Sequence, residues 1–143
     1  MQYQSFGDRI EIRFESGDEF MSNLTALAEA HGITFAAFSG IGAVRSAHVA
    51  YFNSETKQYD THEFDEQFEL TSLIGNIALR DHKPFVHAHA TLARKDLSVI
   101  GGHVMRLLTR PTIELWLRRE APAVRRAPDE ESGLALLDLP ERL

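Results

Sequence analysis

Two of the seven histidines in this 143-residue chain are separated by a single residue, and that spacing suits a metal site. His87 and His89 lie in a strand-like segment, so both imidazole rings should point to one face, about 6.5–7 Å apart at the backbone. His103 follows two glycines on what should be the next strand of the same hairpin. Three imidazoles without a thiolate favour zinc, with nickel, copper, iron or cobalt as alternatives.

The register of this hairpin decides whether the three rings meet. A loop of two or four residues between the strands sends His103 to the face opposite the other two histidines. A loop of three or five residues, or a bulge at Gly101-Gly102, restores all three rings to one face. The metal hypothesis therefore predicts an odd loop or a bulge. The alternative is ordinary packing of histidines on a strand.

A three-histidine site also leaves room for chemistry. Three protein ligands leave one coordination position for water or a small ligand, as in catalytic zinc sites. If the protein is an enzyme, metal-dependent hydrolysis or a lyase reaction at that position is expected. A serine nucleophile is not, because Ser39 and Ser72 lack the accompanying histidine and acid. The Gly40–Gly42 segment lacks the third glycine of a phosphate-binding loop and is better explained as a tight turn between strands.

The elements that position these residues predict an α+β fold. Alternation over Asp8–Glu15 indicates a strand, and a helix is expected from about 18 to 31, with Ser16 as N-cap and Gly32 as its stop. Strand-like segments then follow over residues 33–39, 43–52, 59–64, 67–80, 85–93, 97–104 and 112–119. We expect one principal helix packed on six or seven mostly antiparallel strands, in a sandwich or open barrel.

Composition narrows the compartment and the class of protein. The chain has no cysteine, which excludes disulfides and fits a reducing compartment. The N-terminus shows no basic and then apolar signal pattern. No apolar run approaches the roughly 18–20 residues of a membrane span. A cytoplasmic protein with no membrane partner is expected.

The net charge argues against sequence-independent binding of DNA through its phosphates. The formal net charge is −6, and a domain that binds duplex phosphates usually carries a basic surplus. The exception is an arginine-rich stretch between residues 106 and 126. Its candidate nucleic-acid residues are Arg106, Arg110, Arg118 and Arg119. A solvated face or ion pairs between subunits explain such a cluster more readily than a DNA contact.

The chain divides by composition near residue 120. Residues 1–120 are expected to form one domain, and residues 121–143 a tail. The tail is rich in proline, arginine and acids and then carries a leucine cluster (Leu134, Leu136, Leu137 and Leu139), so it should dock on the domain or on a neighbouring subunit. The alternative is a frayed terminus.

Four motifs in order resemble the PPC domain, the plant and prokaryote conserved domain. They are Ser39–Ala43 (SGIGA), Glu69–Ala78 (ELTSLIGNIA), Pro84–His89 (PFVHAH) and Gly101–His103 (GGH). The resemblance covers about residues 8–120. The ending Glu131–Leu134 is also similar to the tails of bacterial members.

This resemblance implies an α+β fold, a homotrimer and, in prokaryotic members, a metal held by residues matching His87, His89 and His103. It also suggests a DNA-binding or transcription-regulatory role, or a small-ligand role. The chain departs from the plant type, which accompanies AT-hook motifs. No Arg-Gly-Arg-Pro occurs here, and Gln67–Leu70 lacks the Gly-Arg that precedes the plant segment used for protein partners.

Overall fold

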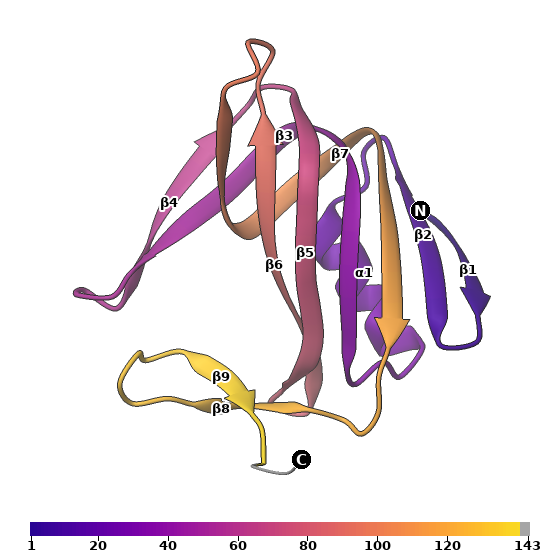
Figure 1. The fold of residues 1–143 in the computed structure, drawn as a ribbon, viewed down its shortest axis with the longest axis vertical. Helices are drawn as coiled ribbons and strands as arrows, with labels where there is room; N and C mark the ends of the chain where they lie inside the picture. Colours follow the sequence, from indigo (N-terminus) through magenta and orange to yellow (C-terminus); the bar gives the residue numbers. More distant parts are fainter. Residues whose placement is uncertain (141–143) are drawn as a thin grey trace.

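The first 30 residues form a hairpin followed by a helix in the computed structural model, which describes residues 1–140 (Figure 1). β1 (Gln2–Phe6) pairs antiparallel with β2 (Arg9–Glu15), and α1 (Phe20–Ala30) follows. The strand predicted over Asp8–Glu15 and the helix are confirmed. All five residues of β1 are exposed, so this strand has no alternating pattern that could have revealed it.

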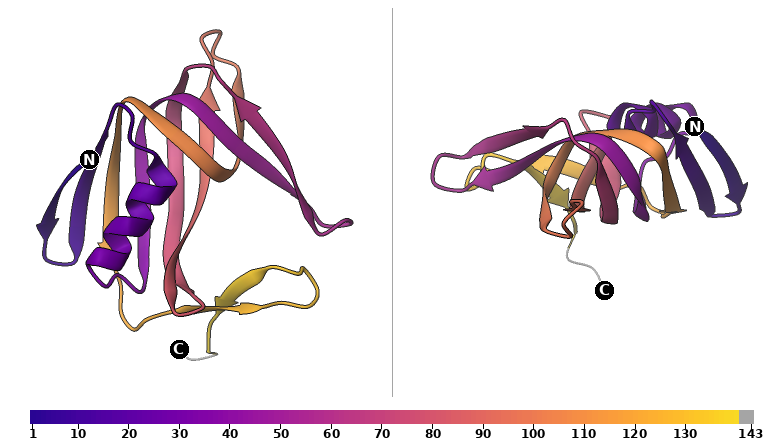
Figure 2. Two further views of the ribbon diagram at one scale, coloured as in Figure 1. Left: turned by 180° about the vertical axis from the view of Figure 1, so that it is seen from behind. Right: turned by 90° about the horizontal axis from the view of Figure 1, so that it is seen from above.

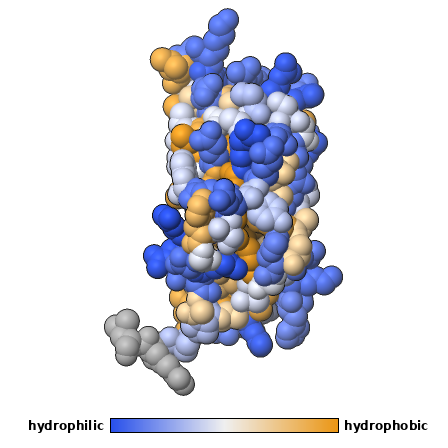
Figure 3. Space-filling view, turned by 90° about the vertical axis from the view of Figure 1, so that its right-hand side faces the viewer, coloured by the Kyte–Doolittle hydropathy of each residue, from blue (hydrophilic) through white to orange (hydrophobic). Residues whose placement is uncertain are grey.

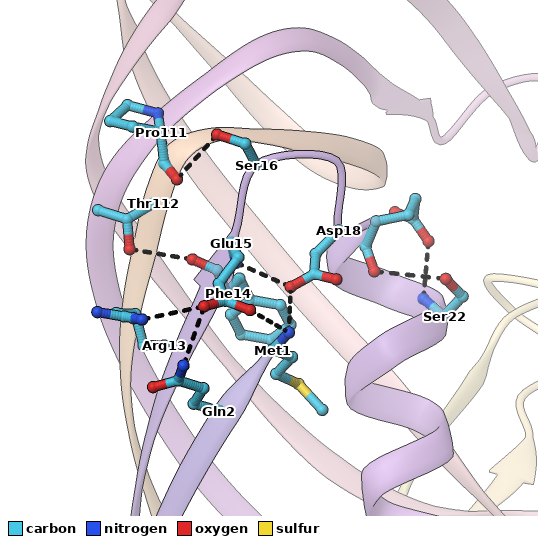
Figure 4. Close-up of polar contacts among 11 residues, drawn as sticks. Met1, Gln2, Arg13, Phe14, Glu15, Ser16, Asp18, Ser22, Pro111 and Thr112 are labelled. Carbon is cyan, nitrogen blue, oxygen red and sulfur yellow. Dashed lines mark hydrogen bonds and ion pairs between the residues drawn. The ribbon is translucent and has the colours of Figure 1, made fainter.

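The predicted N-cap of α1 is wrong, because Glu19 caps the helix in place of Ser16. The Glu19 carboxylate accepts hydrogen bonds from the backbone N–H groups of Met21 and Ser22, at 3.0 and 2.7 Å. The Ser16 hydroxyl instead donates to the carbonyl oxygen of Pro111, at 3.3 Å (Figure 4). A tertiary contact with a distant strand therefore takes Ser16 away from the helix end.

Strands make up most of the remaining chain. They are β3 (Ala36–Asn53), β4 (Gln58–Phe64), β5 (Phe68–Arg80), β6 (Lys83–Ala93), β7 (Val99–Arg119), β8 (Arg125–Pro128) and β9 (Ala135–Asp138). The described residues thus hold one helix and nine strands, so the α+β class is confirmed while the predicted count of six or seven strands is too low.

All nine strands belong to one sheet, so of the two predicted arrangements, a sandwich or an open barrel, the sandwich is wrong and the open barrel is the closer description. The main order is β1-β2-β7-β3-β5-β8-β9, with β4 paired to β3, and β6 paired to both β5 and β7. The pairs are antiparallel except for the contact between β5 and β8. The sheet curves strongly, so that it resembles an open, incomplete barrel (Figure 1). Long β3 and β7 make this possible, because each pairs with different neighbours along its length.

At two places where the sequence predicted an interruption between strands, the structure has a continuous strand. The Gly40–Gly42 segment is not a turn: β3 runs through it, and its pairing with β5 shifts register there. The segments predicted at 97–104 and 112–119 are parts of one strand, β7. Glycines and prolines are common in turns, but a bulge absorbs the same residues without reversing the chain.

The core lies between the sheet and α1, which covers one face (Figure 2). Fully buried side chains of α1 include Phe20 and Leu24, and they pack with sheet residues such as Phe14 and Leu92. α1 has 11 residues, and no helix within residues 1–140 is long and apolar enough to cross a membrane. The side of the molecule that carries β1 shows hydrophilic surface with small hydrophobic patches (Figure 3).

The C-terminal hairpin of β8 and β9 contacts two separate parts of the sheet. Leu79 of β5 donates its backbone N–H to the carbonyl oxygen of Val124, at 2.9 Å, just before β8. Lys57, in the turn between β3 and β4, donates to the carbonyl oxygen of Glu130, at 3.0 Å. The hairpin thus spans the open end of the curved sheet (Figure 1). The division of the chain at residue 120 stays a prediction.

Candidate metal centre

The loop between β6 and β7 has the odd length that the metal hypothesis requires. Ala93 pairs with Val99 and His89 pairs with His103, which leaves five residues, 94–98, in the loop. Pairing between these two strands continues through Gly101 and Gly102 without a register shift. Of the two predicted solutions, the odd loop is confirmed and the bulge is absent from this pairing.

This register places three imidazole rings on one face of the sheet. His87 and His89 alternate with Val86, Ala88 and Ala90, which are buried in the core, so the histidines point away from it. The ring centroids form a nearly equilateral triangle, with sides of 5.2, 5.1 and 5.4 Å. His87 and His103 are partly buried, whereas His89 is exposed.

The nitrogen atoms of the triad are grouped closely enough to be candidate ligands of a single ion. One nitrogen from each ring lies within 4.8 Å of the other two. Tetrahedral zinc, with bonds of 2.0–2.1 Å to nitrogen, needs these atoms about 3.4 Å apart. Neutral imidazole is a ligand that zinc prefers, and the donor set therefore suits the ion.

Close packing explains the glycine before His103. At this position β7 lies between β6 and β3, and Ala50 of β3 pairs with His103. A Cβ atom at Gly102 would lie 2.7 Å from the carbonyl oxygen of Ala50, closer than real Cβ atoms approach. The glycine therefore lets three strands pack tightly beside the histidines.

Electrostatics keeps two of the rings neutral. Burial, with smaller contributions from His103, Arg126 and His89, lowers the pKa of His87 to about 4. Burial also lowers the pKa of His103, assisted by His89 and Arg126. Both rings are therefore neutral at pH 7, and neutral imidazole has the lone pair that a metal ion needs.

Two polar side chains beside the triad were not found from the sequence. Arg126 of β8 lies 3.3 Å from Nδ1 of His87 through its Nη2 atom, and the same atom donates to Oδ1 of Asn76, at 2.7 Å. A guanidinium has no acceptor, so Nδ1 of His87 accepts in this contact. Arg126 stands 39 residues from His87 in the chain, and no spacing motif links them.

The remaining histidines lie outside the triad. His31 contacts the hydroxyl of Tyr3, at 3.0 Å from its Nε2 atom. His48 lies 3.6 Å from the Glu63 carboxylate, a partner that the sequence did not suggest. His62 stacks on Phe64.

The four arginines considered for nucleic-acid binding do not form one cluster. Arg106 lies in the middle of β7, whereas Arg118 and Arg119 lie at its end. Twelve residues of strand span about 40 Å along the chain. Arg118 forms ion pairs with Asp8 and Glu120, and Arg119 donates to the carbonyl oxygen of Gly7. A DNA role for these residues, with Arg110, stays a prediction.

Comparison with known proteins supports the resemblance. The model of the Plants and Prokaryotes Conserved domain matches residues 1–119. Among solved structures, a plant- and prokaryote-conserved protein from Pyrococcus horikoshii is 31% identical, with a TM-score of 0.88; the match covers 99% of this chain and 97% of that chain. No curated protein matches the chain.

Two further structures are similar over nearly their whole length. A metal-containing protein from Archaeoglobus fulgidus is 33% identical, with a TM-score of 0.86 and coverage of 97% of this chain and 99% of that chain. A candidate DNA-binding protein from Bacteroides thetaiotaomicron is 28% identical, with a TM-score of 0.92 and coverage of 96% of each chain.

Proposed function

Because this chain belongs to the Plants and Prokaryotes Conserved domain family, we propose that it binds a divalent transition-metal ion, zinc foremost, through His87, His89 and His103. The observation that carries the proposal is the triangle of rings, with one nitrogen from each within 4.8 Å of the other two. The neutral state of His87 and His103 supports it, as does the similarity to the metal-containing protein from Archaeoglobus fulgidus.

In this proposal the chain holds the ion on the face of the β6–β7 hairpin that points away from the core. A zinc ion with three protein ligands keeps a position for water or a ligand. Hydrolysis gains no support from the neighbouring side chains: the described residues lining the adjacent pocket include no aspartate or glutamate to act as general base. We therefore propose a metal-dependent binding module in place of a hydrolase or lyase.

Metal content tests the site directly. Purified protein is expected to hold about one ion per chain, measured by mass spectrometry of the metal after dialysis. His87→Ala and His103→Ala should each lower affinity by more than about 100-fold, because each removes a ligand, and even the loss of an outer partner costs 10–100-fold. Exposed His62 on β4 supplies the matched control, His62→Ala.

The identity of the ion is read from the same measurement, with zinc, nickel, copper, iron and cobalt compared in competition. Circular dichroism verifies that each variant is folded. Metal retained at wild-type stoichiometry in both His87→Ala and His103→Ala would contradict the proposed site.

We further propose that the chain forms a homotrimer. Trp116 and Ile74 flank Ser39 across three neighbouring strands, and they are 46% and 57% exposed. Large apolar side chains grouped on one sheet face favour association with another protein surface. If identical subunits covered Trp116 and Ile74, they would also cover the same face of the long strands β3 and β7.

Light scattering measures this association. The wild-type protein should have three times the mass of the chain, and Trp116→Glu should shift it towards the monomer because it puts a charge into the contact. Leu97→Glu is the control, since Leu97 is 80% exposed in the β6–β7 loop. A monomeric wild type, or a Trp116→Glu trimer as stable as the control, argues against this assembly.

A further inference from the structure

A cavity lies next to the histidine triad. It has a volume of about 360 Å³ and opens where the C-terminal hairpin approaches β5 and β6. His87 and His103 line this cavity together with Arg80 and Arg126. This volume falls within the range of small-molecule sites.

Two guanidinium groups share one aromatic ring in this cavity. Arg80 lies over the ring of Phe85, with its Cζ 4.0 Å from the centroid, and the Cζ of Arg126 lies 5.3 Å from the same centroid. Burial lowers the pKa of Arg126, and repulsion from Arg80 lowers it further. The two positively charged groups therefore lie close together and repel each other, so each makes it less favourable for the other to be charged.

Among residues 1–140, no acidic side chain offsets these charges. Within residues 1–140, neither Arg80 nor Arg126 forms an ion pair, and no aspartate or glutamate lines the cavity. Arg126 is held in place by neutral acceptors, the Asn76 side chain and the carbonyl oxygen of Ala135 at 3.0 Å. Its Nε atom is buried without a hydrogen-bond partner among the described residues. An unpaired buried donor is costly, so an acceptor supplied by a ligand would stabilise this group.

The rest of the cavity wall is largely apolar. Phe85, Met105 and Leu136 line it, and Leu136 comes from the same C-terminal hairpin as Arg126. An inorganic anion would leave these side chains uncovered. An occupant with a charged end and a short hydrocarbon body matches both parts of the wall.

We propose that this cavity binds a small organic carboxylate, with the carboxylate against Arg126 and Arg80 and the hydrocarbon part against Phe85, Met105 and Leu136. Guanidinium and carboxylate match in geometry and form paired hydrogen bonds. Since Arg126 also contacts His87, the ligand lies beside the proposed ion. The position of the ligand beside an ion rests on the proposed metal site. The binding of the carboxylate itself depends on Arg80 and Arg126, which are not proposed metal ligands.

The probe pair is isovalerate and isovaleramide, which have the same shape and differ in charge. Binding to the full-length protein as purified is measured by ligand-observed NMR titration. Isovalerate should bind saturably and at least about tenfold more tightly than the amide, as expected for a charged hydrogen bond. Inorganic phosphate, titrated separately, should bind more weakly than isovalerate.

Variants locate the site on the arginines. Arg126→Gln should weaken isovalerate binding by about ten- to a hundredfold. Arg125→Gln is the matched control, because Arg125 is the preceding residue of β8 and is exposed. Arg80→Gln serves as a second variant if Arg126→Gln does not fold, and it should weaken binding in the same direction.

Three results would overturn the inference: no saturable isovalerate binding, equal affinity for the amide, or unchanged affinity in both arginine variants. Tighter binding of phosphate would overturn the carboxylate class. Metal content measured on the same samples separates the two proposals. A metal-free wild type that binds isovalerate through Arg126 contradicts only the metal site, whereas a metal-loaded protein that binds no isovalerate contradicts only the carboxylate pocket.

Discussion

Adding zinc to chelator-treated protein is expected to raise its free energy of unfolding by about 4 kcal/mol when free zinc is about 1,000 times the dissociation constant. The reason is that the proposed ion joins two strands: His87 and His89 belong to β6, and His103 belongs to β7. The unfolded chain does not hold these rings together, so an ion that binds the folded state stabilises it. Urea denaturation at fixed zinc concentrations measures the change.

The same titration distinguishes the triad from incidental binding by surface histidines. His103→Ala should remove most of the zinc-dependent stabilisation, and His62→Ala should retain it. The domain should remain folded without the ion, because its core of large buried side chains is formed by α1 and the sheet. Equal stabilisation of His103→Ala and wild type would show that zinc acts elsewhere.

Gly75→Ala is expected to destabilise the protein by about 3 kcal/mol or more, an overpacking effect at the upper end of the usual range. Gly75 pairs with Ala88, between the two histidines of β6. An added Cβ would overlap the carbonyl oxygen of His87 and would lie 2.5 Å from Cζ of Phe38. The first neighbour is backbone, so relief requires β5 and β6 to separate.

That separation should also disturb the candidate metal centre. Gly75→Ala should therefore bind zinc more weakly than wild type, as well as unfolding at lower urea concentration. Glu69→Ala, on the same strand and exposed, is the control and should change stability by less than about 1 kcal/mol. A fully stable Gly75→Ala protein with normal zinc affinity would mean that the strands accommodate the methyl group.

Local patterns in the sequence were sufficient for α1 and for several strands. The alternation in β2 and the helical spacing of Phe20, Leu24 and Leu27 reflect which side chains become buried. The chain breaks were less predictable. Gly40 and Gly42 occur as readily in a bulge as in a turn, and only pairing with β5 and β7 on both sides distinguishes the two.

By itself the sequence determined that His87 and His89 share a face, because side chains alternate along any strand. It also showed that His103 could reach this face in only two ways, through a loop of odd length or through a bulge. Tertiary structure decided between them, since the five-residue loop sets the register that pairs His89 with His103. It alone brought Arg126 to His87, because the C-terminal hairpin docks on β5 through contacts that no local pattern encodes.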